Sequence, residues 1–334
     1  MNFSMWGQAL RGMPRPTREE WDRLDLISRW LVTTRAAVLL MTLTSAGIGG
    51  LCAWRDGFFD ISGWLWVAAG LLLAHATNNL LNDLIDHKKG VDKDNYFRTQ
   101  YGPQPLAQGL LSPMAFAAYV AVTGGAALAI GLTLAWTGGE PVWWLLTAGV
   151  GMVIFYTWPL KYLGLGEPAV LAVWGPLMVG GTYQVLVGEW SWVAAAFSMP
   201  YALGVTGVLF GKHIDKLESD QAKGIRTLPV ILGHRAARYS VIGMMVVQYL
   251  AVGALIAAGW TSPLLLITLL SLGTFRVAVR VYRKPAPKEA PPELPAGVWP
   301  LWYVAIAFHH NARFGLFYLL GLIGDTLLVA RTLG

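Results

Sequence analysis

The chain has 334 residues, of which 55% are hydrophobic and only 13% are charged, whereas about a quarter of the residues in an ordinary soluble domain carry a charge. This composition excludes a soluble globular protein and indicates a membrane protein. The formal net charge of +6 does not indicate a nucleic-acid partner, because the basic residues are distributed as a membrane topology requires.

Nine apolar runs are predicted to form membrane helices. About 20 apolar residues are needed to cross a bilayer core of about 30 Å as a helix, which satisfies its own backbone polar groups. The runs lie at approximately 31–54, 62–82, 113–136, 141–160, 168–187, 191–211, 236–259, 261–279 and 312–331. The sequence therefore predicts an all-α polytopic protein, with a cytoplasmic N-terminal arm over residues 1–30 and a single transmembrane domain over residues 31–334.

The lysines and arginines predict the orientation of these helices. With the N-terminus in the cytoplasm, all of them fall on the cytoplasmic side except Arg35, Arg55, Arg313 and Arg331. This positive-inside bias predicts a cytoplasmic N-terminus and an external C-terminus in the cell inner membrane. The arm has acidic residues and lacks a short apolar region with a small-residue cleavage site, so no removable signal peptide is predicted. Arg35, at the start of the first run, is expected to snorkel toward the lipid headgroups.

A polar stretch follows the second apolar run directly. Residues 78–92 read NNLLNDLIDHKKGVD. In a helix, Asn82 and Asp86 stand at i and i+4 on one face, and Gly90 permits a turn that brings Asp92 back toward them. Polar side chains this dense at a membrane face are costly unless they line an aqueous or ligand-filled cavity. We therefore expect a central cavity that opens near the cytoplasmic face.

A second acidic stretch follows the sixth run, where residues 215–229 read DKLESDQAKGIRTLP. The predicted topology puts both stretches on the cytoplasmic side, and two carboxylate clusters facing one cavity repel each other unless a cation lies between them. Mg2+ is the natural candidate, because it is held by one or two carboxylates together with substrate phosphates. No Cys/His arrangement indicates zinc, and no Walker-type loop indicates a nucleotide. The expected ligand is a diphosphate with an apolar tail, which Lys161 and Arg226 are placed to help neutralise.

These motifs resemble those of the UbiA superfamily of intramembrane prenyltransferases. The matching segments are, in chain order, Asn82-Asp83-x-x-Asp86-x-x-x-Gly90-x-Asp92, Tyr156-x-x-Pro159-x-Lys161, Gly164-Leu165-Gly166-Glu167, Gly181-Thr182-Tyr183 and Asp220-x-x-x-Gly224-Ile225-Arg226-Thr227-Leu228. The first segment is similar to the form found in the menaquinone-pathway branch. The resemblance covers about residues 30 to 330.

The resemblance implies an Mg2+-dependent transfer of an isoprenyl group from an isoprenyl diphosphate to an aromatic acceptor such as dihydroxynaphthoate, in quinone biosynthesis within the lipid bilayer. The implied metal ligands are Asn82, Asp83, Asp86, Asp92, Asp215, Glu218 and Asp220. The implied catalytic residues, which hold or neutralise the diphosphate while the allylic carbon–oxygen bond ionises, are Asp86, Asp220, Lys161 and Arg226. The implied substrate contacts, in which aromatic faces shield the carbocation, are Asn79, Lys161, Arg226, Lys216, Tyr156 and Tyr183.

The sequence departs from the family pattern at two positions. The family usually has an aspartate four residues before Asp220, and this chain has Lys216 there. Either the helix register shifts so that Asp215 replaces that aspartate, or Lys216 contacts the diphosphate directly and one metal site is reduced; we favour the first hypothesis. Gln104 stands where many relatives have an arginine, which leaves the preference for tail or acceptor open.

Two other functions stay open at the level of sequence. The same ionisation can serve another acceptor, such as a different aromatic, a chlorophyll-like alcohol or a carotenoid, or the tail's own double bonds in a terpene cyclase. A non-enzymatic cation transporter predicts ionisable residues buried along a path through the membrane, and the third to ninth runs contain very few.

Overall fold

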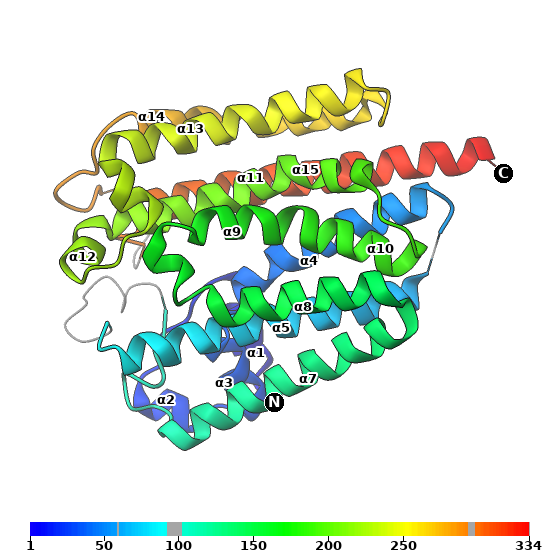
Figure 1. The fold of residues 1–334 in the computed structure, drawn as a ribbon. Coiled ribbons are helices and arrows are strands. Elements are labelled where there is room, and N and C mark those ends of the chain that lie inside the picture. The colour runs from blue at the N-terminus through cyan, green and yellow to red at the C-terminus, as the bar shows by residue number, and fades with distance from the viewer. Residues whose placement is uncertain (59, 92–101, 293–297, 334) are drawn as a thin grey trace.

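The computed structural model describes residues 1–334 except 59, 92–101, 293–297 and 334. The described part of the chain is helical and contains no strand. Its helices run back and forth along one long axis, as Figure 1 shows. The elements of the arm are α1 (Phe3–Arg11), α2 (Arg18–Asp22) and α3 (Leu26–Thr33). The elements of the bundle are α4 (Ala36–Arg55), α5 (Ile61–Lys88), α7 (Pro113–Gly138), α8 (Glu140–Phe155), α9 (Gly166–Ala172), α10 (Gly181–Val187), α11 (Trp192–Asp215), α12 (Leu217–Ala222), α13 (Leu228–Ala257), α14 (Leu272–Tyr282) and α15 (Trp302–Leu333).

Seven helical segments among the described residues are long and apolar enough to cross a membrane. They are Ala36–Arg55, Pro113–Gly138, Gly166–Val187, Trp192–Asp215, Leu228–Ala257, Pro263–Tyr282 and Trp302–Ala330. The prediction of nine spans is therefore not confirmed. The other two predicted spans coincide with α5, whose second half is rich in polar side chains, and with α8, which has only 16 residues.

Helix α11 lies at the centre of the core, where Phe197, Tyr201 and Val205 are buried. Small residues allow its neighbours to approach closely, as is common between membrane helices. A Cβ atom on Gly211 would lie 2.9 Å from the Cα atom of Val304 in α15. The sequence of α11 thus determines how closely α15 packs against it.

The segment between α9 and α10 is an interrupted helix. Val173–Gly180 has π-helical hydrogen bonding, and Gly175 leaves helical geometry with φ −90° and ψ −117° just before Pro176. Proline removes a backbone donor and disrupts the helix before it. The carbonyl of Trp174 accepts a hydrogen bond from the Ser45 hydroxyl at 3.0 Å, which ties this break to α4.

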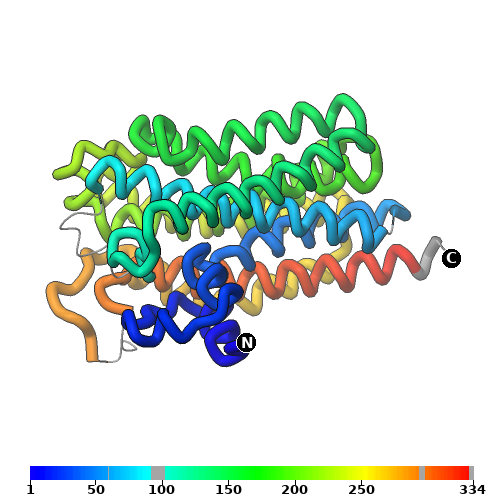
Figure 2. Tube along the Cα trace, turned by 90° about the horizontal axis from the view of Figure 1, so that it is seen from below, coloured from blue at the N-terminus to red at the C-terminus, as the bar shows by residue number. Residues whose placement is uncertain are grey.

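The N-terminal arm folds back against the bundle beside the start of α4, as Figure 2 shows. Trp21 is 1% exposed and packs in a small core with Ala9, Leu24, Val32 and Leu110. The arm is therefore an ordered element rather than a helix lying alone on the membrane surface.

Candidate active site

A cavity of about 790 Å³ runs between α5, α7, α8 and the interrupted helix. Six basic residues line it, namely Arg11, Arg15, Arg35, Lys161, Lys212 and Lys216. Apolar side chains of α7 and α8 also line it, among them Leu128, Leu134, Leu145, Leu146 and Val150. The lining of the cavity thus combines cationic side chains with apolar side chains, a combination that suits an anion attached to an apolar tail.

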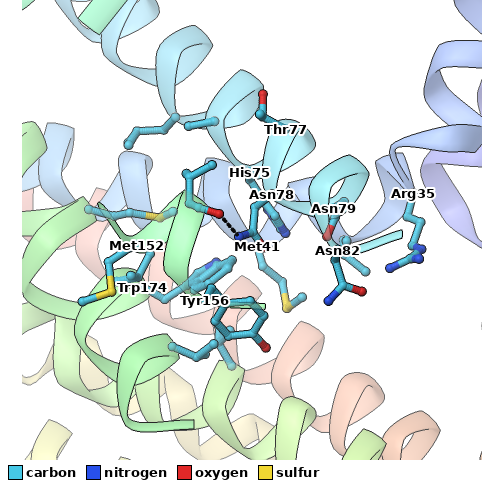
Figure 3. Close-up of a pocket in the computed structure, with 18 of the residues that line it drawn as sticks. Arg35, Met41, His75, Thr77, Asn78, Asn79, Asn82, Met152, Tyr156 and Trp174 are labelled. Atoms are coloured by element: carbon cyan, nitrogen blue, oxygen red, sulfur yellow. Dashed lines mark hydrogen bonds between the residues drawn. The ribbon is translucent and has the colours of Figure 1, made fainter. Parts of the chain in front are cut away.

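The wall formed by α5 presents carboxamides to the cavity (Figure 3). The amide nitrogen of Asn78 donates to the carbonyl of Val153 at 3.2 Å, and that of Asn79 donates to the carbonyl of Thr34 at 2.9 Å. The amide nitrogen of Asn82 lies 3.2 Å from the hydroxyl of Thr157. These bonds orient the side chains of the first polar stretch. Figure 3 also shows Tyr156 and Trp174 across the cavity from them.

Asp86 and Lys161 form the main ion pair of the first stretch. The ammonium Nζ of Lys161 lies 3.0 Å from both carboxylate oxygens of Asp86. Asp86 is fully buried and Lys161 is 3% exposed. Lys161 reaches this position from the tight 3₁₀ turn Leu160–Leu163 that follows α8. Removing one partner from such a buried pair typically costs about 3–5 kcal/mol, because it strands the other charge.

The side chain of Arg35 lies in a different place from the one predicted from the sequence. It does not snorkel to the headgroups but lines the cavity, where its guanidinium donates to the carboxylate of Asp83. Its backbone has φ +58°, in the left-handed region that non-glycine residues rarely adopt. This conformation joins α3 to α4 and turns the side chain inward, so Asp83 is engaged by an arginine.

Two carboxylates of the second acidic stretch, Asp220 and Glu218, are placed in different surroundings. The ammonium of Lys216 lies 2.8 Å from Oδ1 of Asp220, which is 1% exposed. The other oxygen of Asp220, Oδ2, is buried and has no hydrogen-bond partner within the described part of the chain. The side chain of Glu218 is 92% exposed and lies 3.9 Å from His234. Asp220 is therefore placed inward, whereas Glu218 points to the solvent.

Asp215 is also placed differently from the favoured sequence hypothesis. Its two carboxylate oxygens accept hydrogen bonds from the backbone N–H groups of Tyr303 and Val304, at 2.8 and 2.9 Å. These N–H groups lie in the first turn of α15, where they lack partners within their own helix. Helix α11 ends at Asp215 and α12 begins after Lys216. The register shift that would turn Asp215 toward the cavity is not what the structure shows, and Lys216 lines the cavity instead.

Three further predicted residues lie outside this cluster. Arg226 is exposed. Tyr183 donates its hydroxyl hydrogen to Asp56 at 2.7 Å, at the end of α4 where the helix has crossed the bundle. Neither residue is among those that line the cavity. Asp92 lies outside the described residues.

The two acidic stretches are nevertheless joined. The ammonium of Lys223, just after α12, donates to the backbone carbonyl of Val91, at the end of the first stretch. Asn82 from the first stretch and Lys216 from the second line the same cavity.

One pair at this site was not predicted from the sequence. Nδ1 of His213 lies 2.5 Å from Oε1 of Glu167, and both side chains are almost fully buried. Oε2 of Glu167 accepts the backbone N–H of Leu228 at 3.2 Å. His213 lines the cavity one helical turn before Lys216. Glu167 stands in a matching motif, but nothing in the sequence pairs it with a histidine 46 positions away.

The fold and the site are those of a helical membrane protein whose cavity joins basic side chains to an apolar lining. The chain belongs to the UbiA prenyltransferase family, whose profile matches residues 39–294.

Named relatives agree with this assignment. The chain is 29% identical over 228 residues to the UbiA prenyltransferase domain-containing protein 1 of Danio rerio, a match that covers 63% of this chain and 64% of the relative. The chain thus spans slightly less than two thirds of that relative's length.

Two solved structures share the fold. The apo structure of a UbiA homolog from Aeropyrum pernix has a TM-score of 0.63 at 19% identity, covering 86% of this chain and 98% of that one. A UbiA homolog from Archaeoglobus fulgidus bound to DMAPP and Mg2+ has a TM-score of 0.56 at 14% identity, with the same coverage.

Proposed function

We propose that this protein transfers an isoprenyl group from a polyprenyl diphosphate to an aromatic acceptor of the dihydroxynaphthoate kind, as a step in quinone biosynthesis. One observation carries the proposal: a single cavity combines basic side chains, three of which pair with carboxylates behind the wall, with an apolar wall that can hold a prenyl tail. The structural relative that binds DMAPP and Mg2+ supports the choice of ligand and metal.

The donor atoms at and behind the basic part of the cavity lining fit Mg2+; of the three residues that supply them, Asn82 lines the cavity and two aspartates lie behind the wall. Asn82, Asp86 and Asp220 offer only oxygen atoms as ligands, which Mg2+ prefers. Oδ2 of Asp220, which has no hydrogen-bond partner among the residues that the structure describes, is a buried carboxylate oxygen that a cation would satisfy. We assign these three residues as the proposed metal holders, and Asp92 remains a proposed fourth. When bound, Mg2+ neutralises the diphosphate charge and so favours its departure.

The residues of the chain itself have distinct proposed roles. Lys161 and Lys216 bind diphosphate oxygens and stabilise the negative charge that grows as the allylic carbon–oxygen bond breaks and its electron pair leaves with the diphosphate. The apolar walls hold the tail and exclude water from the carbocation. The ring faces of Tyr156 and Trp174 lie across the cavity, where they can stabilise the cationic carbon.

The acceptor ring then supplies the electron pair for the new carbon–carbon bond, and the same ring carbon loses its proton. We propose that His213, oriented by Glu167, takes that proton. A histidine held by a carboxylate through one ring nitrogen presents the other nitrogen as a base.

The proposed orientation places the arm and both acidic stretches in the cytoplasm. In Figure 1, helices α2, α3 and α12 lie at one end of the bundle and the C-terminus at the other. This arrangement agrees with the positive-inside bias.

The test is to incubate the purified protein with Mg2+ and radiolabelled geranylgeranyl diphosphate, with and without dihydroxynaphthoate. The proposal predicts a prenylated naphthoate that forms only with the acceptor present. A cyclised hydrocarbon formed without acceptor, or a product with a different acceptor only, would contradict the proposed acceptor chemistry.

A further inference from the structure

The N-terminal arm contributes to the wall of the cavity. Arg11, Gly12, Met13 and Arg15 are among the lining residues, although the family profile begins only at residue 39. The short connection between α1 and α2 therefore lies against the substrate site, and it comes from a part of the chain outside the matched family region.

The arm is fixed in this place by specific contacts. The guanidinium Nη1 of Arg18 donates to the carbonyl of Gly109 at 2.7 Å, which ties the start of α2 to the loop before α7. The backbone N–H of Asn2 donates to the carboxylate of Asp25 at 2.7 Å, which ties the start of α1 to the start of α3. With Trp21 buried beneath them, these contacts hold residues 11–15 in position without a ligand.

The lining of the cavity is strongly basic. No aspartate or glutamate is among the described residues that line the cavity, whereas six lysines and arginines are. Arg35, Lys161 and Lys216 each face a carboxylate behind the wall. Arg11 and Arg15 add two guanidinium groups, whose planar donor arrangement matches phosphate oxygens in pairs.

We propose that Arg11 and Arg15 form a second, arm-borne wall of the diphosphate site, which binds the terminal phosphate. This inference rests on the proposed function only in that the ligand is a prenyl diphosphate. The arm is thereby a substrate-binding element that selects for a diphosphate over a neutral prenyl alcohol.

The test is a binding titration on the full-length protein in lipid nanodiscs with Mg2+. The probe is geranylgeranyl thiodiphosphate, which binds as the substrate does but ionises slowly. The double variant Arg11→Gln/Arg15→Gln is compared with Arg23→Gln, an exposed arginine of the same arm that does not line the cavity. Each lost charge-assisted contact is expected to weaken the Kd on the order of tenfold, while Arg23→Gln leaves it unchanged.

Further readouts separate binding from folding and from chemistry. KM for geranylgeranyl diphosphate should rise with the Kd, while kcat at saturation stays within about twofold, and Arg11→Lys/Arg15→Lys should recover part of the affinity. A double Gln variant that binds the probe as Arg23→Gln does overturns the inference, as does a wild-type chain that binds no diphosphate. If binding depends on the two arginines but no prenylated aromatic forms, the proposed acceptor chemistry fails and the role of the arm stands.

Discussion

Substitution of Asp215 and of Lys216 should have opposite effects, although the two residues are neighbours. Asp215 caps α15 through the N–H groups of Tyr303 and Val304. Losing a helix N-cap costs about 0.5–2 kcal/mol, and this cap accepts two bonds from a partly buried position, so we expect Asp215→Ala to lie near 2 kcal/mol. Turnover per folded molecule should stay close to that of the wild type, because the carboxylate faces away from the reacting groups.

Lys216→Met should instead remove most activity from the molecules that are folded. It takes one cation from the cavity and strands Asp220, whose Oδ2 already lacks a partner among the described residues. Losing one preorganised charge-stabilising group typically lowers kcat by about 10²–10³-fold.

The assay for this pair combines unfolding in mixed micelles, followed by circular dichroism, with prenyl transfer per folded molecule. The reasoning would be refuted if Asp215→Ala had normal stability but lost its activity and its Mg2+ dependence, while Lys216→Met stayed active. That result would support the hypothesis in which a shift of helix register turns Asp215 toward the cavity.

Three further predictions concern other parts of the molecule. His213→Asn should lower kcat by about 10²-fold and should create a primary kinetic isotope effect with an acceptor deuterated at the prenylated carbon, because proton loss becomes slow; an unchanged isotope effect would remove His213 from the mechanism. Gly211→Ala should destabilise the protein by about 1–3 kcal/mol, measured by unfolding, because the new Cβ would lie 2.9 Å from the backbone of Val304. Gly253→Ala is the control and should leave the stability unchanged, because Gly253 has open space around it. The backbone N–H of Ser28 donates to Asp25 and lowers the pKa of that carboxyl; the ionised carboxylate therefore stabilises the arm above the unfolded-state pKa of about 3.9, and this stabilisation is lost as the pH falls below that value. Hydrogen-exchange protection of the arm should fall in acid in the wild type and depend less on pH in Asp25→Asn. Equal pH dependence in the two proteins would contradict this prediction.

The helical membrane fold could be predicted from the sequence because it depends on local properties. Apolar runs of sufficient length and the bias of lysine and arginine require no knowledge of tertiary contacts. The density of polar residues at the end of α5 likewise indicated a cavity; Asn82 and Lys161 line it, and Asp86 pairs with Lys161 behind the wall.

What the sequence did not predict depends on contacts between distant segments. The direction of Asp215 is decided by the start of α15, 88 positions away. Arg35 turns inward because Asp83 offers it a buried carboxylate and because its backbone takes a left-handed conformation. Tyr183 matches a family motif, yet its hydroxyl bonds to Asp56 at the end of α4 and not to a group at the cavity. The direction of α10, which carries Tyr183, follows from the break at Gly175 and the packing around that break. None of these partners can be found by spacing alone.

The central claim is that the two acidic stretches act on one diphosphate, and a double-mutant cycle tests it most directly. The measurement is kcat/KM for Mg2+-dependent diphosphate release from geranylgeranyl diphosphate by the wild type, Asp86→Asn, Asp220→Asn and the double variant. If both carboxylates serve one site, each single variant should lose at least about 10²-fold and the double variant little more than either, because groups that act as a unit are not additive. Losses that multiply in the double variant, or a silent single variant, would contradict the account.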